Sequence, residues 1–112
     1  MEAINVVVSV PRPSAAVVEL KGEHDPTSSR PLHELITGLI QTNDLVVIDV
    51  SHTLYIDAAV IGVLFEANKM ARRERKRLRL QVGTTHIVRR ALEITGVLDA
   101  LETVATRGEA LS

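Results

Sequence analysis

One stretch of the chain combines an acidic side chain with the start of a helix. Asp57 ends a short extended run that begins at Leu54, and an apolar helical pattern starts directly after it at Ala58. At such a strand-to-helix junction the first backbone N–H groups of the helix are free, and the positive end of its dipole faces outwards. The junction is therefore predicted to be where an anion, a phosphorylated side chain or a protein partner docks.

The other polar residues form no catalytic or metal-binding pattern. The four histidines lack the spacing of metal ligands, which predicts surface or loop positions for them. The chain has no cysteine, which removes thiolate catalysis, disulfides and the common zinc frameworks. Asp49 follows a buried strand, where ligands often gather in α/β sheets, but a structural role is favoured. We expect a protein that is not an enzyme and holds no cofactor or metal.

Composition restricts the class of protein further. A length of 112 residues predicts one domain over 1–112, and 46% hydrophobic with 24% charged residues is typical of a folded chain. Net charge is −1, so no global field should attract nucleic acid or an anionic membrane, and an aromatic content of 2% further disfavours nucleic-acid binding. The N-terminus lacks the pattern of a signal peptide, and no apolar run approaches the roughly 20 residues of a membrane span. We expect no membrane insertion and a cytoplasmic location.

Hydrophobic periodicity predicts the elements that position the junction. Strands are expected at 4–10, ended by Pro11, at 15–20, and at 45–50, where a continuous apolar run indicates burial on both faces. An amphipathic helix follows, with apolar residues spaced from Leu32 to Ile40, Ser28 or Ser29 as its cap and its end at 42–44. The next helix should span 58–73 with Asp57 as its N-cap.

The C-terminal third is predicted by the same rules. Leu78, Leu80 and Val82 alternate with Arg79 and Gln81, which predicts a strand with one wetter face. A helix capped by Thr84 or Thr85 and ended by Gly96 should bury Ile87, Val88, Ala91 and Leu92. A short strand over 101–104 and a few terminal residues complete the chain. The order β-β-α-β-α-β-α-β predicts an α/β domain with a mixed, mostly parallel sheet and helices packed against it.

The 58–73 helix carries two different apolar surfaces. At about 100° per residue, one stripe should face the sheet, comprising Val60, Val63, Leu64, Ala67, Met70 and Ala71. A second, low-relief patch lies beside it and is predicted to be an interface: Ala58, Ile61, Gly62 and Phe65. The alternative is that Ile61 and Phe65 pack under a neighbouring loop or helix.

Four motifs in the expected order resemble the STAS domain, which bacterial anti-sigma factor antagonists share with sulphate-transporter tails. Leu20–Asp25 is similar to the family's Gly-Glu-x-Asp, and the Val46–Ser51 strand also fits. Tyr55–Leu64 is similar to Ile-Asp-Ser-Ser-Gly-Leu-Gly-Val-Leu, and Arg89–Val97 to the third helix and closing turn. The resemblance covers nearly the whole chain and implies the STAS fold.

The resemblance implies a regulator that binds an anti-sigma factor with a serine kinase fold and so frees a sigma factor. In the family, phosphorylation of the serine after the Asp ends binding, but that position is Ala58 here and the next Ser/Thr position is Ala59. The serine switch cannot operate at Ala58, although one of Ser51, Thr53, Thr84 and Thr85 could be a displaced phosphoacceptor. The partner-binding residues are expected to be Asp25, Asp57, Ala58, Ala59, Ile61, Gly62 and Phe65.

Two other functions stay open from the sequence. One is a STAS adaptor or structural module in a stress-signalling complex or a lipid-transport machine. The other is a sensor of a small anionic ligand at the Asp57 helix start. The basic run from Lys69 to Arg79 is predicted to be a solvated helix end, with a patch for nucleic acid or an acidic partner as its alternative. The oligomeric state is not predicted.

Overall fold

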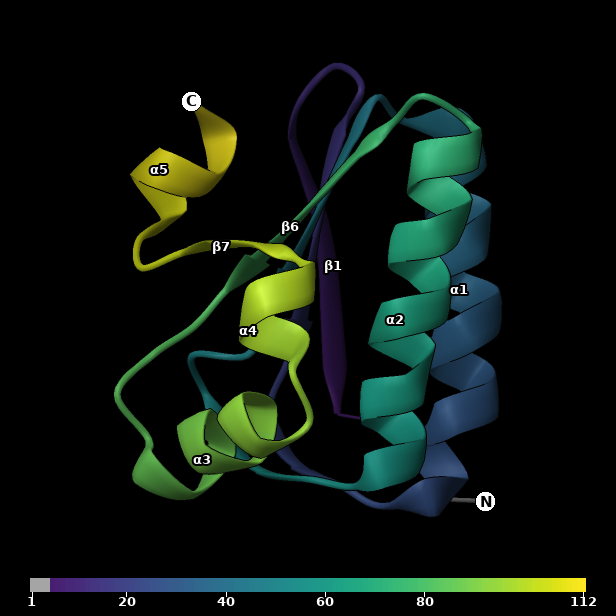
Figure 1. The fold of residues 1–112 in the computed structure, drawn as a ribbon. Coiled ribbons are helices and arrows are strands. Elements are labelled where there is room, and N and C mark those ends of the chain that lie inside the picture. Colours follow the sequence, from purple (N-terminus) through teal and green to yellow (C-terminus); the bar gives the residue numbers. More distant parts are fainter. Residues whose placement is uncertain (1–4) are drawn as a thin grey trace.

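The computed structural model describes residues 5–112, which form a five-stranded sheet in the order β1-β2-β4-β6-β7 (Figure 1). β1 and β2 pair antiparallel, and every other neighbouring pair in this sheet is parallel. The predicted α/β class with a mixed, mostly parallel sheet is confirmed. The strands are β1 (Val6–Arg12), β2 (Ala15–Leu20), β4 (Leu45–Asp49), β6 (Arg77–Gln81) and β7 (Glu102–Val104).

Helices cover the two faces of the sheet unequally. The larger hydrophobic cluster joins one face to α1 (Ser29–Thr42), α2 (Ala58–Arg73), α3 (His86–Ile94) and α4 (Val97–Ala100). The smaller cluster joins the other face to α5 (Arg107–Leu111). In Figure 1, α1 and α2 lie side by side and α5 lies on the far side of the strands. A 3-10 turn, η1 (Pro26–Ser28), precedes α1.

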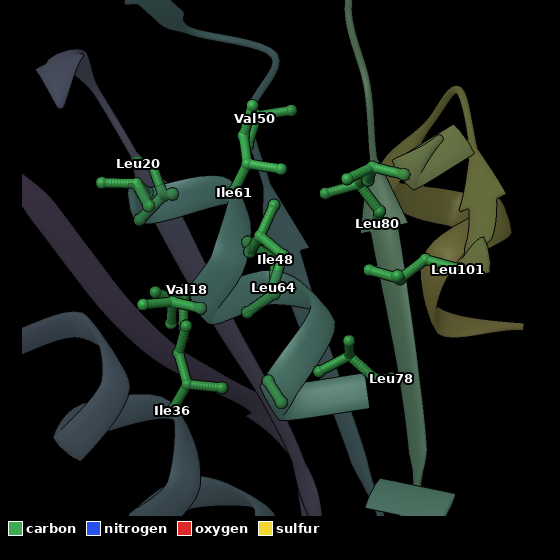
Figure 2. Packing of buried hydrophobic residues seen from close by; sticks show 14 of the residues in the cluster. Val18, Leu20, Ile36, Ile48, Val50, Ile61, Leu64, Leu78, Leu80 and Leu101 are labelled. Carbon is green, nitrogen blue, oxygen red and sulfur yellow. The ribbon is translucent and has the colours of Figure 1, made fainter. Parts of the chain in front are cut away.

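The core consists of aliphatic side chains from the central strands and α2. All five residues of β4 are buried, as the continuous apolar run predicted for a strand covered on both faces. Ile48 of β4 lies near Leu64 and Ile61 of α2 in Figure 2, with Val18 beside them. The predicted sheet-facing stripe of α2 is buried except for Met70, which is half-buried.

The first strand is longer than predicted, because Pro11 does not end it. β1 continues to Arg12, and the predicted start at residue 4 lies outside the described residues. A proline lacks the N–H that a central strand must donate, but an edge strand has one side without a neighbour. β1 is at the edge of the sheet, so Pro11 is tolerated there.

The prediction that β6 has one more solvent-exposed face is wrong. Arg79 and Gln81 are both buried, and Arg79 is only 5% exposed. α5, a helix that the sequence pattern did not predict, covers them, and Arg79 Nη1 donates to the carbonyls of Ala110 and Ser112 at 2.8 Å each. An alternating pattern indicates which face of a strand carries polar side chains, but it does not predict that a later segment of the chain will cover that face.

Helix α3 also differs from its predicted orientation. Val88 and Leu92 are buried as expected, Ala91 is half-buried, and Ile87 is 65% exposed.

Thr85 occupies the N-cap position without a side-chain hydrogen bond, as does Ser28 before α1. The predicted left-handed Gly96 is confirmed by its φ of 83°, a conformation that glycine adopts without steric cost.

Candidate functional site

A second, two-stranded sheet builds the site, and the sequence pattern did not predict it. β3 (Gly22–His24) pairs in parallel with β5 (Thr53–Ile56). The chain leaves β2 at Gly22, whose φ of 69° lets it turn into β3. The Asp57 N–H then donates to the His24 carbonyl at 2.9 Å. This pairing fixes Asp25 and Asp57 at the ends of neighbouring strands.

Both carboxylates cap helical turns. Asp57 Oδ2 accepts from the Ala59 N–H at 2.8 Å, which confirms Asp57 as the N-cap of α2. Asp25 Oδ1 accepts from the Thr27 N–H at 3.0 Å and also from the Thr27 hydroxyl. Each carboxylate therefore satisfies an N–H group that would otherwise be free at a helix start.

Tyr55 lies in the negative electrostatic field of Asp57 and Asp25. Its hydroxyl donates to Asp57 Oδ1 at 3.3 Å, and the negative charge of Asp57 raises the pKa of Tyr55, with a smaller contribution from Asp25. The Thr27 hydroxyl, by donating to Asp25, lowers the pKa of that carboxyl. The start of α2 is thus negatively charged. A partner's hydrogen-bond donor or cation suits it better than the free anion considered above.

The exposed surface of α2 differs from the prediction at one residue. Ala58, Ala59 and Gly62 are exposed and Phe65 is half-buried, but Ile61 is only 3% exposed and belongs to the core. Ile61 therefore packs inwards, as the alternative reading of its position allowed, and is not part of the exposed patch. A Cβ built on Gly62 meets no atom within 4 Å, so the backbone is open to solvent there.

A groove runs beside this surface, between the first turns of α1 and the first half of α2. Its cavity volume is about 390 Å³, and the lining residues are Ser29, Arg30, His33, Ala59, Gly62, Val63 and Glu66. Arg30 and His33 were not among the predicted site residues. Nothing in their sequence separation from Gly62 could have shown that α1 and α2 lie against each other.

His24 was expected at the surface, and that expectation is wrong. It is fully buried beneath the loop that carries Asp25. Its Nε2 lies 3.1 Å from the Lys21 carbonyl and 3.2 Å from the Asn5 carbonyl, and because carbonyls only accept, Nε2 must carry the hydrogen. His24 therefore ties the β2–β3 turn to the chain before β1 and holds Asp25 in place.

Asp49 has the structural role that the sequence favoured. It is 2% exposed, accepts from the Ser51 N–H at 2.8 Å and lies 2.5 Å from Arg107 Nη2. Arg107 also pairs with Glu19 at 3.5 Å and donates to Gln81. Glu19, Asp49 and His52 could supply three ligand atoms within 4.8 Å of one another, but the Arg107 guanidinium already neutralises both carboxylates.

The remaining hydroxyls differ in access. Thr53 is fully buried and its hydroxyl donates to the Leu20 carbonyl at 2.6 Å, so it is closed to a modifying enzyme in this fold. Ser51 is half-buried beside His52, with 3.3 Å between Oγ and Nδ1.

Within residues 5–112, no helix has both the length and the apolar character to cross a bilayer.

Comparison with known proteins supplies a family. The family described as "Mlab, STAS domain" matches residues 9–106. A comparison with curated protein sequences finds no match.

Several solved structures resemble this chain in their fold. The unphosphorylated anti-sigma factor antagonist SpoIIAA is 17% identical, with a TM-score of 0.81, and the alignment covers 95% of this chain and 92% of that one. An anti-sigma factor antagonist from Mycobacterium paratuberculosis is 20% identical, with a TM-score of 0.83 and coverages of 97% and 92%. The STAS domain of a SulP transporter from Vibrio cholerae is 15% identical, with a TM-score of 0.63 and coverages of 89% and 80%. At these identities the likeness shows the fold.

Proposed function

Because the chain belongs to the STAS domain family, we propose that it is a non-enzymatic regulator of the anti-sigma factor antagonist type. It binds an anti-sigma factor with a serine kinase fold and thereby frees a sigma factor. The docking surface is the first half of α2 with the neighbouring β3–η1 loop. The observation that carries this proposal is the exposed, small-residue start of α2 with two carboxylates at its end.

Shape supports a protein partner at this surface. Ala58, Ala59 and Gly62 present little more than backbone, so another chain can approach α2 closely. The half-buried Phe65 adds apolar area one turn further along the helix. Aromatic side chains are enriched at the centres of protein interfaces, and Phe65 is the aromatic residue of this surface.

Charge supports a partner that brings donors or cations. Asp25 and Asp57 lie at the end of the surface, and Asp57 keeps one oxygen turned towards the Tyr55 hydroxyl. An arginine or lysine of the partner would form charge-assisted hydrogen bonds there. Asp25, Asp57, Ala58, Ala59, Gly62 and Phe65 are therefore the proposed contact residues.

The absence of a hydroxyl at Ala58 sets the regulation. We take Ala58 to stand where the antagonists carry the phosphorylated serine, because the Tyr55–Leu64 motif resembles theirs, and a methyl group accepts no phosphate. Binding is therefore insensitive to the kinase activity of the anti-sigma factor at this position. Control would come from the amount of protein or from another site.

The test is a binding assay between the full chain and each kinase-fold anti-sigma factor of its host. The variants are Gly62→Arg and the matched control Gly38→Arg, since both glycines lie in helices where a Cβ meets nothing within 4 Å. We expect Gly62→Arg to abolish binding and Gly38→Arg to leave it unchanged, and ATP to have no effect. Equal binding by both variants would show that the surface is wrong. Release by ATP would contradict the proposed regulation.

A second function is an adaptor in a transport complex. Two observations favour it: the description of the matching family, and the fold shared with a transporter's STAS domain. The same surface would then dock on a transporter subunit instead of an anti-sigma factor. Affinity purification of the tagged chain from its host separates the two, because a transporter subunit would be recovered in one case and an anti-sigma factor in the other.

A further inference from the structure

We propose that the end of the molecule opposite the start of α2 docks on an anionic lipid surface. This end is formed by the β1–β2 hairpin and the α2–β6 loop, and we call it the basic edge: Val10–Ser14 together with Arg72, Arg73, Arg75, Lys76 and Arg77. Figure 1 shows the hairpin and the last turn of α2 projecting at the same end, with the start of α2 at the other. The basic edge therefore leaves the proposed partner surface free.

Strand register brings these segments together. Arg12 pairs with Ala15, Ala15 with Leu45, and Leu45 with Arg77, so these residues form one row across four strands. The Ser14 carbonyl accepts from the N–H groups of Asp44 and Leu45, and the Asp44 carbonyl accepts from the Arg77 N–H. The hairpin and the end of α2 are thus held against the same edge of the sheet.

Positive charge exceeds negative charge at this edge, because the segment Arg72–Arg77 contains five cations and one carboxylate, the exposed Glu74. Lys76 pairs with Asp44 at 3.8 Å, and Arg77 with Glu102 at 3.1 Å. Within the described residues, Arg12, Arg72, Arg73 and Arg75 have no acidic partner, and all four are exposed. A chain of net charge −1 therefore carries a local cationic surface.

The hairpin adds exposed apolar groups to this charge. Val10 is 59% exposed, and Pro11 and Pro13 on either side of Arg12 are exposed too. Apolar side chains among cations fit the boundary between lipid headgroups and acyl chains, where binding strength grows with buried apolar area and with attraction to anionic lipid. Nucleic acid fits less well, because the two aromatic residues that could stack on bases, Tyr55 and Phe65, belong to β5 and the first half of α2.

The test measures co-sedimentation of the full chain with vesicles of phosphatidylcholine alone or mixed with phosphatidylglycerol, at about 0.1 M and about 1 M salt. We expect binding only to the mixed vesicles and only at the lower salt. Arg72→Glu/Arg73→Glu should weaken it by about tenfold or more. The matched control is Lys21→Glu/Arg90→Glu, which changes net charge equally at exposed positions away from the basic edge and should bind like the wild type.

Two further variants separate the proposal from its alternatives. Arg12 lies in β1, outside every helix, and Arg12→Glu should also weaken vesicle binding. This variant tests the proposal even if Arg72→Glu/Arg73→Glu destabilises α2. Val10→Ser should weaken binding while the salt dependence persists. No binding to mixed vesicles, equal loss in variant and control, unchanged binding by Val10→Ser, or tighter binding to a DNA duplex than to the vesicles would each overturn the proposal.

Discussion

The Asp57 N–H donates to the His24 carbonyl across 2.9 Å, and this bond joins the end of β3 to the residue after β5, more than thirty positions along the chain. It closes the β3–β5 pair and sets Asp25 beside the start of α2. The proposed partner surface is therefore not a property of the helix alone. The surface depends on the short parallel pair β3–β5, which the buried His24 holds in place through hydrogen bonds to the carbonyls of Asn5 and Lys21.

Removal of the α2 cap should lower stability by a measurable amount. Asp57→Ala deletes the acceptor of the Ala59 N–H, and we expect the free energy of unfolding to fall by about 1 kcal/mol. Urea denaturation measures this change. Thr85→Ala is the matched control, because Thr85 occupies an N-cap position without a side-chain hydrogen bond, so its replacement should change stability by less than about 0.5 kcal/mol. Equal losses would contradict the capping role of Asp57.

Tyr55 should titrate above its ordinary value of 10.0 because of the negative charge of Asp57. It is the chain's single tyrosine, and there is no tryptophan, so phenolate absorbance reports it alone. Asp57→Asn should bring the pKa of Tyr55 down towards its ordinary value, whereas Asp99→Asn, which removes a charge elsewhere, should not. Since the folded-state pKa is raised, the stability contributed by Tyr55 is present below pH 10 and is lost as pH rises through the raised value. An unshifted Tyr55 in the wild type would count against the geometry.

Two glycines should be replaceable at a gain in stability. Gly38 and Gly62 lie inside α1 and α2, and a Cβ at either position meets nothing within 4 Å. Gly38→Ala and Gly62→Ala should each raise the free energy of unfolding by about 0.5–1 kcal/mol, because alanine loses less backbone entropy in a helix. Thermal denaturation tests both. A loss of stability for Gly62→Ala alone would mean that the groove is narrower than the structure shows.

Arg107 should hold α5 against the sheet through Asp49. Arg107→Ala leaves the buried Asp49 without its cation, and we expect a loss of about 2 kcal/mol, below the range for fully buried pairs because Arg107 is partly exposed. Arg30→Ala is the control, since its exposed pair with Glu34 should be worth only about 0.3 kcal/mol.

A second substitution separates the ion pair from other effects of the arginine. Adding Asp49→Asn to Arg107→Ala should recover part of the loss, because the uncompensated charge is then gone. Additive losses from the two substitutions would show that Asp49 and Arg107 do not depend on each other.

Local patterns were sufficient for most of the elements. The continuous apolar run of β4, the 3.6-residue period of α1 and α2, Asp57 as a cap and Gly96 as a left-handed residue all depend on neighbours in the chain. Such features are decided by sterics and hydrogen bonds over a few residues, and the α/β class follows from their order. The sequence alone also determined that Ala58 has no hydroxyl.

Only the tertiary structure decided which elements pack against one another and which residues they cover. Ile61 turned inwards, Arg79 was covered by α5, and His24 was buried, because each is enclosed by segments distant in the sequence. The β3–β5 ladder, the groove between α1 and α2, and the row from Arg12 to Arg77 likewise arise from pairing across the fold. Periodicity indicates which side of an element is apolar. Long-range contacts determine which of its residues remain on the surface.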